Sequence, residues 1–170
     1  MPDLATHYAL SYLVASRALS RREALLVAFI GLLPDVDALL RIHRWVTHSL
    51  VLAVLLFSGL VLLASQWKRA RTLVLVALAL YVLHIALDVF TAPTPVFWPL
   101  DARSYYVKVG LEGSVSGGGI QLVPSLKLIA TESDFAVKPV LEAPLITATG
   151  IITSIAVAAA LAAEALAKKH

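Results

Sequence analysis

The stretch GLLPDVDALLRIHRWVTHSL, residues 31–50, concentrates ionisable side chains in a chain otherwise dominated by leucine, valine and alanine. Two aspartates, two histidines and two arginines fall between Asp35 and His48. A second pair, His84 and Asp88, interrupts another apolar segment with a spacing of four, which puts both side chains on one face of a helix. Imidazole and carboxylate groups bind zinc, manganese and ferrous iron, and they also act as general acids and bases. These residues are therefore the candidates for a functional site.

The composition indicates an integral membrane protein. Of the 170 residues, 59% are hydrophobic, against about 45–50% in soluble domains. Residues 48–65, 72–90 and 145–163 carry almost no charge, and each is close to the roughly 20 residues that a membrane-crossing helix needs. The net charge of +3 is small and scattered, so nucleic acid is not an expected partner, and the lack of cysteine excludes thiolate metal sites. We expect a single membrane domain, residues 1–170.

Helices are expected to position the candidate side chains. The sequence predicts an all-α integral membrane protein with about five transmembrane helices, joined by an extracytoplasmic insertion of about residues 92–140. Within the insertion, SYYVKVGLE and GIQLVPSLKLI have β-like composition, and Ser116–Gly119 can form the turn of a short hairpin. Pro124 restricts the second run to an edge strand or a loop. The expected helices cover about residues 4–19, 22–41, 47–66, 71–90 and 141–167.

Basic residues predict the orientation, because lysine and arginine are in excess in cytoplasmic loops. Basic clusters follow the first, third and fifth expected helices, so two crossings separate each cluster from the next and all three lie on one side, the cytoplasm. The N-terminus, the 42–47 turn and the insertion then face outside. We therefore expect a multi-pass protein of the cytoplasmic membrane. The clusters are Arg17/Arg21/Arg22, Lys68/Arg69/Arg71 and Lys168/Lys169.

This topology brings the polar side chains to one depth. Pro34 disturbs the helix around it, which can turn Asp35 and Asp37 to the same side. Because ionisable groups are costly at bilayer depth, a metal site facing outside is the prediction. A purely structural polar cluster and a proton or ion path are the alternatives. The side chains at the outer helix ends are His7, His43, His48, His84, Asp35, Asp37 and Asp88, and only His170 lies at the other end.

Four segments, GLLPDVD, HRWVTHS, HIALDVFT and VFWPL, resemble the YdjM-like family of membrane-bound metal-dependent hydrolases. The resemblance covers about residues 5–100. Members of that family are prokaryotic multi-pass membrane proteins whose substrates are mostly undefined. The TAPTP segment departs from the family pattern, in which a glycine is common at this place.

A more distant similarity connects the same residues to zinc-dependent phospholipase C and the related single-strand nucleases. It implies a divalent metal, with zinc as the first choice and manganese or iron as alternatives. It also implies that Asp88 bridges if two ions bind. Those enzymes take further ligands downstream, but no histidine lies between Asp88 and His170, so a third ion is not expected. The implied ligands are His7, Asp35, His48, His84 and Asp88.

These patterns predict a membrane-bound metal-dependent hydrolase that acts on a phosphoester of a lipid or lipid-linked substrate at the outer membrane surface. Asp37 would orient the attacking water or act as general base. Arg44 would contact a phosphate at two points, and His43 would protonate a leaving group or hold a ligand. A non-catalytic, metal-stabilised binding or scaffold protein is the first alternative function, and a proton- or ion-coupled transporter is the second.

Overall fold

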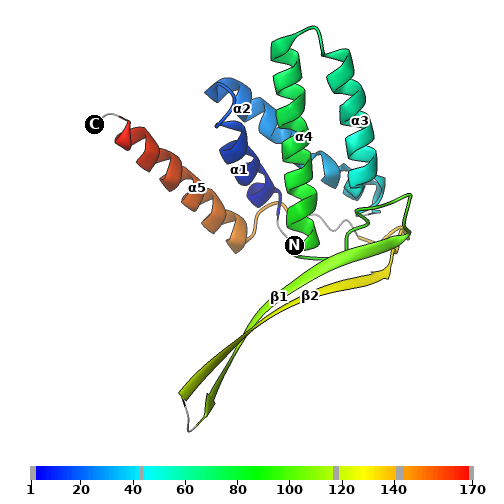
Figure 1. The fold of residues 1–170 in the computed structure, drawn as a ribbon, viewed down its shortest axis with the longest axis vertical. Helices are drawn as coiled ribbons and strands as arrows, with labels where there is room; N and C mark the ends of the chain where they lie inside the picture. Colours follow the sequence, from blue (N-terminus) through cyan, green and yellow to red (C-terminus); the bar gives the residue numbers. More distant parts are fainter. Residues whose placement is uncertain (1–2, 43, 117–118, 141–143, 169–170) are drawn as a thin grey trace.

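The computed structural model describes residues 3–42, 44–116, 119–140 and 144–168. Figure 1 shows a helical body from which a long two-stranded hairpin projects. The helices are α1 (Leu4–Ala15), α2 (Arg21–Val27), the 3₁₀ helices η1 (Ala28–Leu40) and η2 (Val46–His48), α3 (Leu50–Leu63), α4 (Lys68–Val89) and α5 (Ala148–Ala167). The strands are β1 (Arg103–Ser116) and β2 (Gly119–Glu132).

The expectation of an all-α protein with five transmembrane helices is wrong. Among the described helices, only α4, with 22 residues, and α5, with 20, are both long and apolar enough to cross a membrane. Helices α1 and α3 have 12 and 14 residues. At 1.5 Å per residue they are about 18 and 21 Å long, short of the roughly 30 Å hydrocarbon layer. The hairpin expected in the insertion is present, but it is longer than expected because each strand has 14 residues.

The helix expected over residues 22–41 changes character at Ala28, where the 3₁₀ helix η1 begins. Pro34 lies inside η1, and its ring and missing N–H are incompatible with a continuous α-helix. A 3₁₀ helix has three residues per turn, so Asp35 and Asp37 point about 120° apart rather than the about 160° of an α-helix. The segment ends at Arg41 in the left-handed conformation, with φ of 59°. The expected loosening of the helix around Pro34 is therefore present.

The hairpin follows from strict alternation along β1. Val107, Val109 and Leu111 lie on one face, and Lys108 lies on the other, because strand side chains alternate with a period of two. In the antiparallel register Val109 pairs with Leu126 and Lys108 with Lys127, so one face of the hairpin is apolar along its length. Pro124 pairs with Leu111 and is tolerated because both strands of a two-stranded sheet are edge strands.

The helices pack through small residues. Ala15, Ala24 and Leu80 bring α1, α2 and α4 together, and alanine allows close approach of helices in a membrane protein. Phe57 and Tyr81 pack between α3 and α4, with a ring-centroid distance of 5.7 Å. These contacts hold α4 in the middle of the helical body, where it adjoins η1, α1 and α3.

Helix α5 is attached to the body through α1. Buried Asp3 caps α1 by accepting from the Thr6 amide at 2.8 Å, and it also accepts from the amide of Thr147, the N-cap of α5. At the other end Arg17 forms an ion pair with Glu164. The outer face of α5 stays exposed, as Figure 1 shows for the orange and red helix.

The described residues of the three predicted basic clusters lie at one end of the helical body. Figure 1 places the α1–α2 turn, the α3–α4 turn and the end of α5 away from the hairpin and the N-terminus. Arg69 pairs with Glu23 across the starts of α4 and α2, with 3.0 Å between Nε and Oε1. The side of the membrane that each end faces stays a prediction.

Candidate metal centre

Four of the predicted ligands meet at the end of the helical body next to the hairpin. Asp35 comes from η1, His48 from η2, and His84 and Asp88 from α4. One ligand atom from each residue lies within 4.8 Å of the ligand atoms of the other three. His84 Nε2 is 3.4 Å and His48 Nε2 is 3.7 Å from Asp35 Oδ1, and His48 Nε2 is 3.4 Å from Asp88 Oδ2. These donors can hold one divalent ion.

Both imidazole rings of this group are oriented by a contact at Nδ1, the ring nitrogen that does not face Asp35. His84 Nδ1 donates to the Gly31 carbonyl at 2.7 Å, so its Nε2 carries the lone pair that faces Asp35. His84 Nε2 is buried and makes no hydrogen bond among the described residues. His48 Nδ1 lies 3.1 Å from Asp37 Oδ2. Metal-binding histidines commonly hold their second nitrogen against a carbonyl or a carboxylate in this way.

His7 lies beside the group of four. Its ring stacks on His84 with centroids 3.8 Å apart, and its Nε2 is 3.5 Å from Asp88 Oδ1. The side chain is 1% exposed, and neither ring nitrogen has a hydrogen-bond partner among the described residues. A buried imidazole without partners is costly, which is consistent with a ligand. The two oxygens of Asp88 thus face different histidines, the arrangement that a bridging carboxylate needs.

Asp37 lies behind the group. It is buried, and its Oδ2 accepts from the Trp45 amide and the Thr47 hydroxyl, each at 2.7 Å, besides contacting His48. These contacts hold η2 and orient the His48 ring. The predicted role of Asp37 as a water-orienting base stays a prediction.

Arg44 contacts the group directly. Its Nε donates to Asp88 Oδ2 at 2.8 Å, and its side chain is 10% exposed. Nη2 is buried without a hydrogen-bond partner among the described residues. The residue has a φ of 60°, a left-handed conformation that is uncommon outside glycine. His43, the other predicted catalytic residue of this turn, lies outside the described residues.

Two supporting residues were not expected from the sequence. Gly31 supplies the carbonyl for His84, and a Cβ at this position would lie 2.9 Å from Ser11 Cβ, so only glycine fits there without a shift. Ser49 caps α3 by accepting from the Leu52 amide at 3.2 Å, two residues after Thr47, where the sequence predicted the helix to start. For Gly31, the available signal in the sequence was the presence of a glycine four residues before Asp35. For the second, Thr47 and Ser49 are equally good caps by residue type.

The pKa shifts in the group favour a protonated His48 next to an ionised Asp35. Burial alone would lower the pKa of His48, but close contacts with the carboxylates of Asp35, Asp37 and Asp88 outweigh it and raise the pKa to about 10. Burial would raise the pKa of Asp35, but the neighbouring imidazoles of His48 and His84 hold it well below its usual range. A metal ion needs neutral imidazole and would displace the His48 proton.

Two apolar cavities lie beside the group, and Val36 and Leu39 of η1 line both of them. Asp35, the most exposed ligand with 12% of its side chain accessible, lines a cavity of about 350 Å³ together with Leu4, Leu32, Leu39 and Leu145. A second cavity of about 290 Å³ is lined mainly by apolar residues from η1 and the following turn, Val36, Leu39, Leu40, Trp45 and Val46. The centre therefore opens onto an apolar surface through Asp35.

The fold and the buried group define a mainly helical protein with two candidate membrane spans among its described helices and a candidate metal centre. The family model described as YdjM inner membrane protein matches residues 1–169. The chain therefore belongs to the YdjM inner membrane protein family, which confirms the family resemblance noted from its motifs; the metal-dependent hydrolase activity stays a prediction. No curated protein and no solved structure matches the chain.

Proposed function

We propose that the chain is a metal-dependent hydrolase that cleaves a phosphoester of a lipid or lipid-linked substrate at the extracytoplasmic surface of the inner membrane. One observation carries the proposal. Asp35 belongs both to the buried group of donors and to the lining of an apolar cavity. A substrate whose chain occupied this cavity would bring its polar head next to the metal ligands.

The donors present fit a divalent ion. Asp35, His48, His84 and Asp88 would hold it, and His7 would add a ligand beside Asp88. Imidazole and carboxylate without thiolate suit zinc, manganese or ferrous iron, and zinc is our first choice. When bound, such an ion supplies a Lewis acid and a water molecule of lowered pKa.

The protein's own residues orient the ligands and bind the substrate. Asp37 orients the His48 ring from behind. Arg44 holds Asp88 through Nε, and its remaining guanidinium nitrogens are donors suited to a phosphate. Leu4, Leu32 and Leu39 form an apolar wall for an acyl or prenyl chain.

A non-catalytic, metal-stabilised scaffold is the second candidate function. His48, His84 and Asp88 are at most 2% exposed, and Arg44 already occupies one oxygen of Asp88. This burial suits a structural ion as well as a catalytic one. A transporter has less support, because residues 72–83 of α4 hold no charged side chain that could continue a path beyond His84.

The test is turnover by detergent-purified, metal-replete protein. Lipid phosphoesters, including phospholipids and polyprenyl phosphates, would be assayed with and without a chelator. A water-soluble aryl phosphodiester would be assayed in parallel. We expect chelator-sensitive product. A metal-replete sample that yields no such product from any of these substrates would favour the scaffold.

A cavity-filling variant tests the role of the apolar wall. Leu32→Trp should reduce turnover of the lipid about tenfold or more while the soluble diester and the metal content are little affected. Leu63→Trp is the matched control, because Leu63 is 74% exposed on α3 and does not line the cavity. Equal lipid turnover by wild type and Leu32→Trp would contradict the proposed chain site.

A further inference from the structure

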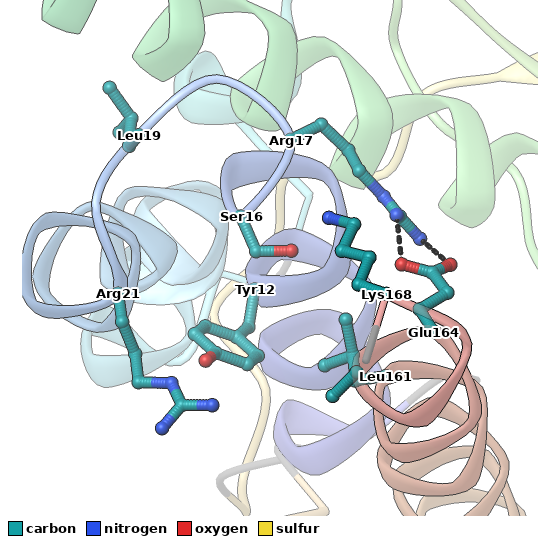
Figure 2. Close-up of a pocket in the computed structure, with 9 residues that line it drawn as sticks. Tyr12, Ser16, Arg17, Leu19, Arg21, Leu161, Glu164 and Lys168 are labelled. Carbon is teal, nitrogen blue, oxygen red and sulfur yellow. Dashed lines mark hydrogen bonds and ion pairs between the residues drawn. The ribbon is translucent and has the colours of Figure 1, made fainter. Parts of the chain in front are cut away.

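A cavity with a partly polar lining lies at the opposite end of the helical body from the metal centre. It has a volume of about 390 Å³ and is lined by the end of α1, the start of α2 and the end of α5 (Figure 2). Its polar lining is Tyr12, Ser16, Arg17, Arg21, Glu164 and Lys168, and Leu19, Leu161 and Ala165 complete it. We call it the α1–α5 basic cavity.

The charges in this cavity do not cancel. Arg17 and Glu164 form a two-point ion pair, with 2.7 Å between Nη2 and Oε1, so they neutralise each other. Arg21 forms no ion pair with the described residues, and Lys168 interacts electrostatically with Glu164 without forming an ion pair with it. In Figure 2 the Lys168 side chain extends from α5 back toward α1, where Ser16 lies. Two positive charges and the Tyr12 hydroxyl are thus available to an anion, whereas the Ser16 hydroxyl donates to the Leu13 carbonyl at 2.7 Å.

The cavity lies where a lipid headgroup would be if α5 crosses the bilayer. Helix α5 has the length and hydropathy of a membrane span, and Ile155 and Leu166 on it are 63% and 61% exposed. Its C-terminal end, where Lys168 lies, is therefore at headgroup depth if α5 crosses the bilayer. Leu161 and Ala165 continue the apolar surface of α5 into the cavity wall. A ligand here would meet cationic groups at one end and apolar groups along its length.

We propose that the α1–α5 basic cavity binds the phosphodiester headgroup of an anionic phospholipid, with the acyl chains lying along α5. Phosphate oxygens accept hydrogen bonds from guanidinium, ammonium and hydroxyl groups, and basic pockets between membrane helices are suited to such headgroups. A zwitterionic lipid is disfavoured because its own cation would lie near Arg21 and Lys168. The proposal does not depend on the metal centre or on hydrolysis.

Native mass spectrometry of the detergent-purified full chain, titrated with dioleoyl phosphatidylglycerol, tests the proposal. The double variant Arg21→Gln/Lys168→Gln should bind this lipid about 20- to 30-fold more weakly than wild type, since each basic group near an anionic surface contributes about fivefold. The matched control is Arg22→Gln/Lys68→Gln, which removes one arginine and one lysine at the same end but outside the cavity. Its affinity should change less than about twofold.

A second variant keeps the charges and fills the space. Ala165→Trp should also weaken phosphatidylglycerol binding. Loss of binding in both variants would show that misfolding of the charge variant is not the cause of its weaker binding. Thermal melting of each variant checks the fold. Wild type should bind dioleoyl phosphatidylcholine much more weakly than phosphatidylglycerol.

Three results would overturn the proposal. An equal loss in the control double variant would show diffuse attraction to basic residues. Equal binding of phosphatidylcholine by wild type would show that the headgroup is not recognised. Inorganic phosphate that displaces phosphatidylglycerol at a similar concentration would identify a site for free phosphate instead of a lipid.

Discussion

Each histidine of the centre differs in what lies behind its ring. His84 has the Gly31 carbonyl and His48 has Asp37, whereas His7 stacks on His84 and has no hydrogen-bond partner among the described residues. Loss of a ligand and loss of the group that orients it should therefore have different consequences, which variants at the two kinds of position can separate.

Removal of a direct ligand should abolish tight metal binding. Loss of a hydrogen-bond partner behind a ligand lowers metal affinity by about 10- to 100-fold. We expect a larger loss of metal affinity from each of the variants His48→Ala, His84→Ala and Asp88→Ala. Metal analysis of purified variants measures this. Asp134→Ala is the control, because Asp134 is exposed and pairs only with Lys138 among the described residues. Full occupancy in all three ligand variants would show that the metal binds elsewhere.

Asp37→Asn distinguishes a positioning residue from a base. If Asp37 orients His48, the variant should bind metal about 10- to 100-fold more weakly, and turnover should recover at saturating metal. Competition with a chelator of known affinity measures the first quantity. If metal affinity is unchanged and turnover is lost at saturating metal, Asp37 acts on the attacking water instead.

Arg44→Lys should reduce turnover by a larger factor than metal content. Lysine keeps the positive charge near Asp88 but cannot contact Asp88 and a phosphate with a planar fork. Turnover and metal content are measured on the same sample. Parallel loss of both would indicate that Arg44 only stabilises the ligand group.

At the scale of elements, the contact between α1 and η1 sets the position of His7 relative to His84. Gly31→Ala should destabilise the protein by about 1–3 kcal/mol, because the added Cβ would overlap the Ser11 side chain and move the carbonyl that holds His84. Ser11→Gly in the same chain should restore much of the loss. Thermal unfolding in detergent measures both.

The control for this contact is Gly59→Ala. A Cβ on Gly59 would meet no atom within 4 Å, so alanine in the middle of α3 should be neutral or stabilising by up to about 1 kcal/mol. Destabilisation by Gly31→Ala that Ser11→Gly fails to relieve would mean that the α1–η1 contact is not as close as described.

For the whole molecule, the arrangement of the ends predicts the topology. In this cysteine-free chain, single cysteines at Ser20 and Ser65 should be shielded from an impermeant thiol reagent in intact cells, and one at Ser114 should be labelled. All three sites are exposed in the structure. Ser104 is unsuitable as the third site, because it is 6% exposed and bonded to Ser133 at 2.8 Å. Labelling at Ser20 or Ser65 would reverse the orientation and place the metal centre on the cytoplasmic side.

Properties that depend on local order along the chain could be read from the sequence. The spacing of His84 and Asp88 places them on one face of a helix, the alternation in residues 104–112 indicates a strand, and Pro34 disturbs its helix. These follow from backbone periodicity and proline geometry, which need no distant partner. The cost of ionisable groups in apolar surroundings also singled out the ligands by residue type.

Properties that depend on packing between distant segments needed the tertiary structure. Apolar runs of similar composition became a 14-residue α3 and a 22-residue α4, because helix ends are decided by caps and contacts rather than by hydropathy. Which polar groups meet was likewise decided by packing. Ligand atoms of four residues lie within 4.8 Å of one another, while Asp37 contacts the far side of the His48 ring and His7 lies beside Asp88. The separation of such groups depends on how α1, η1 and α4 pack, and no single segment encodes that distance.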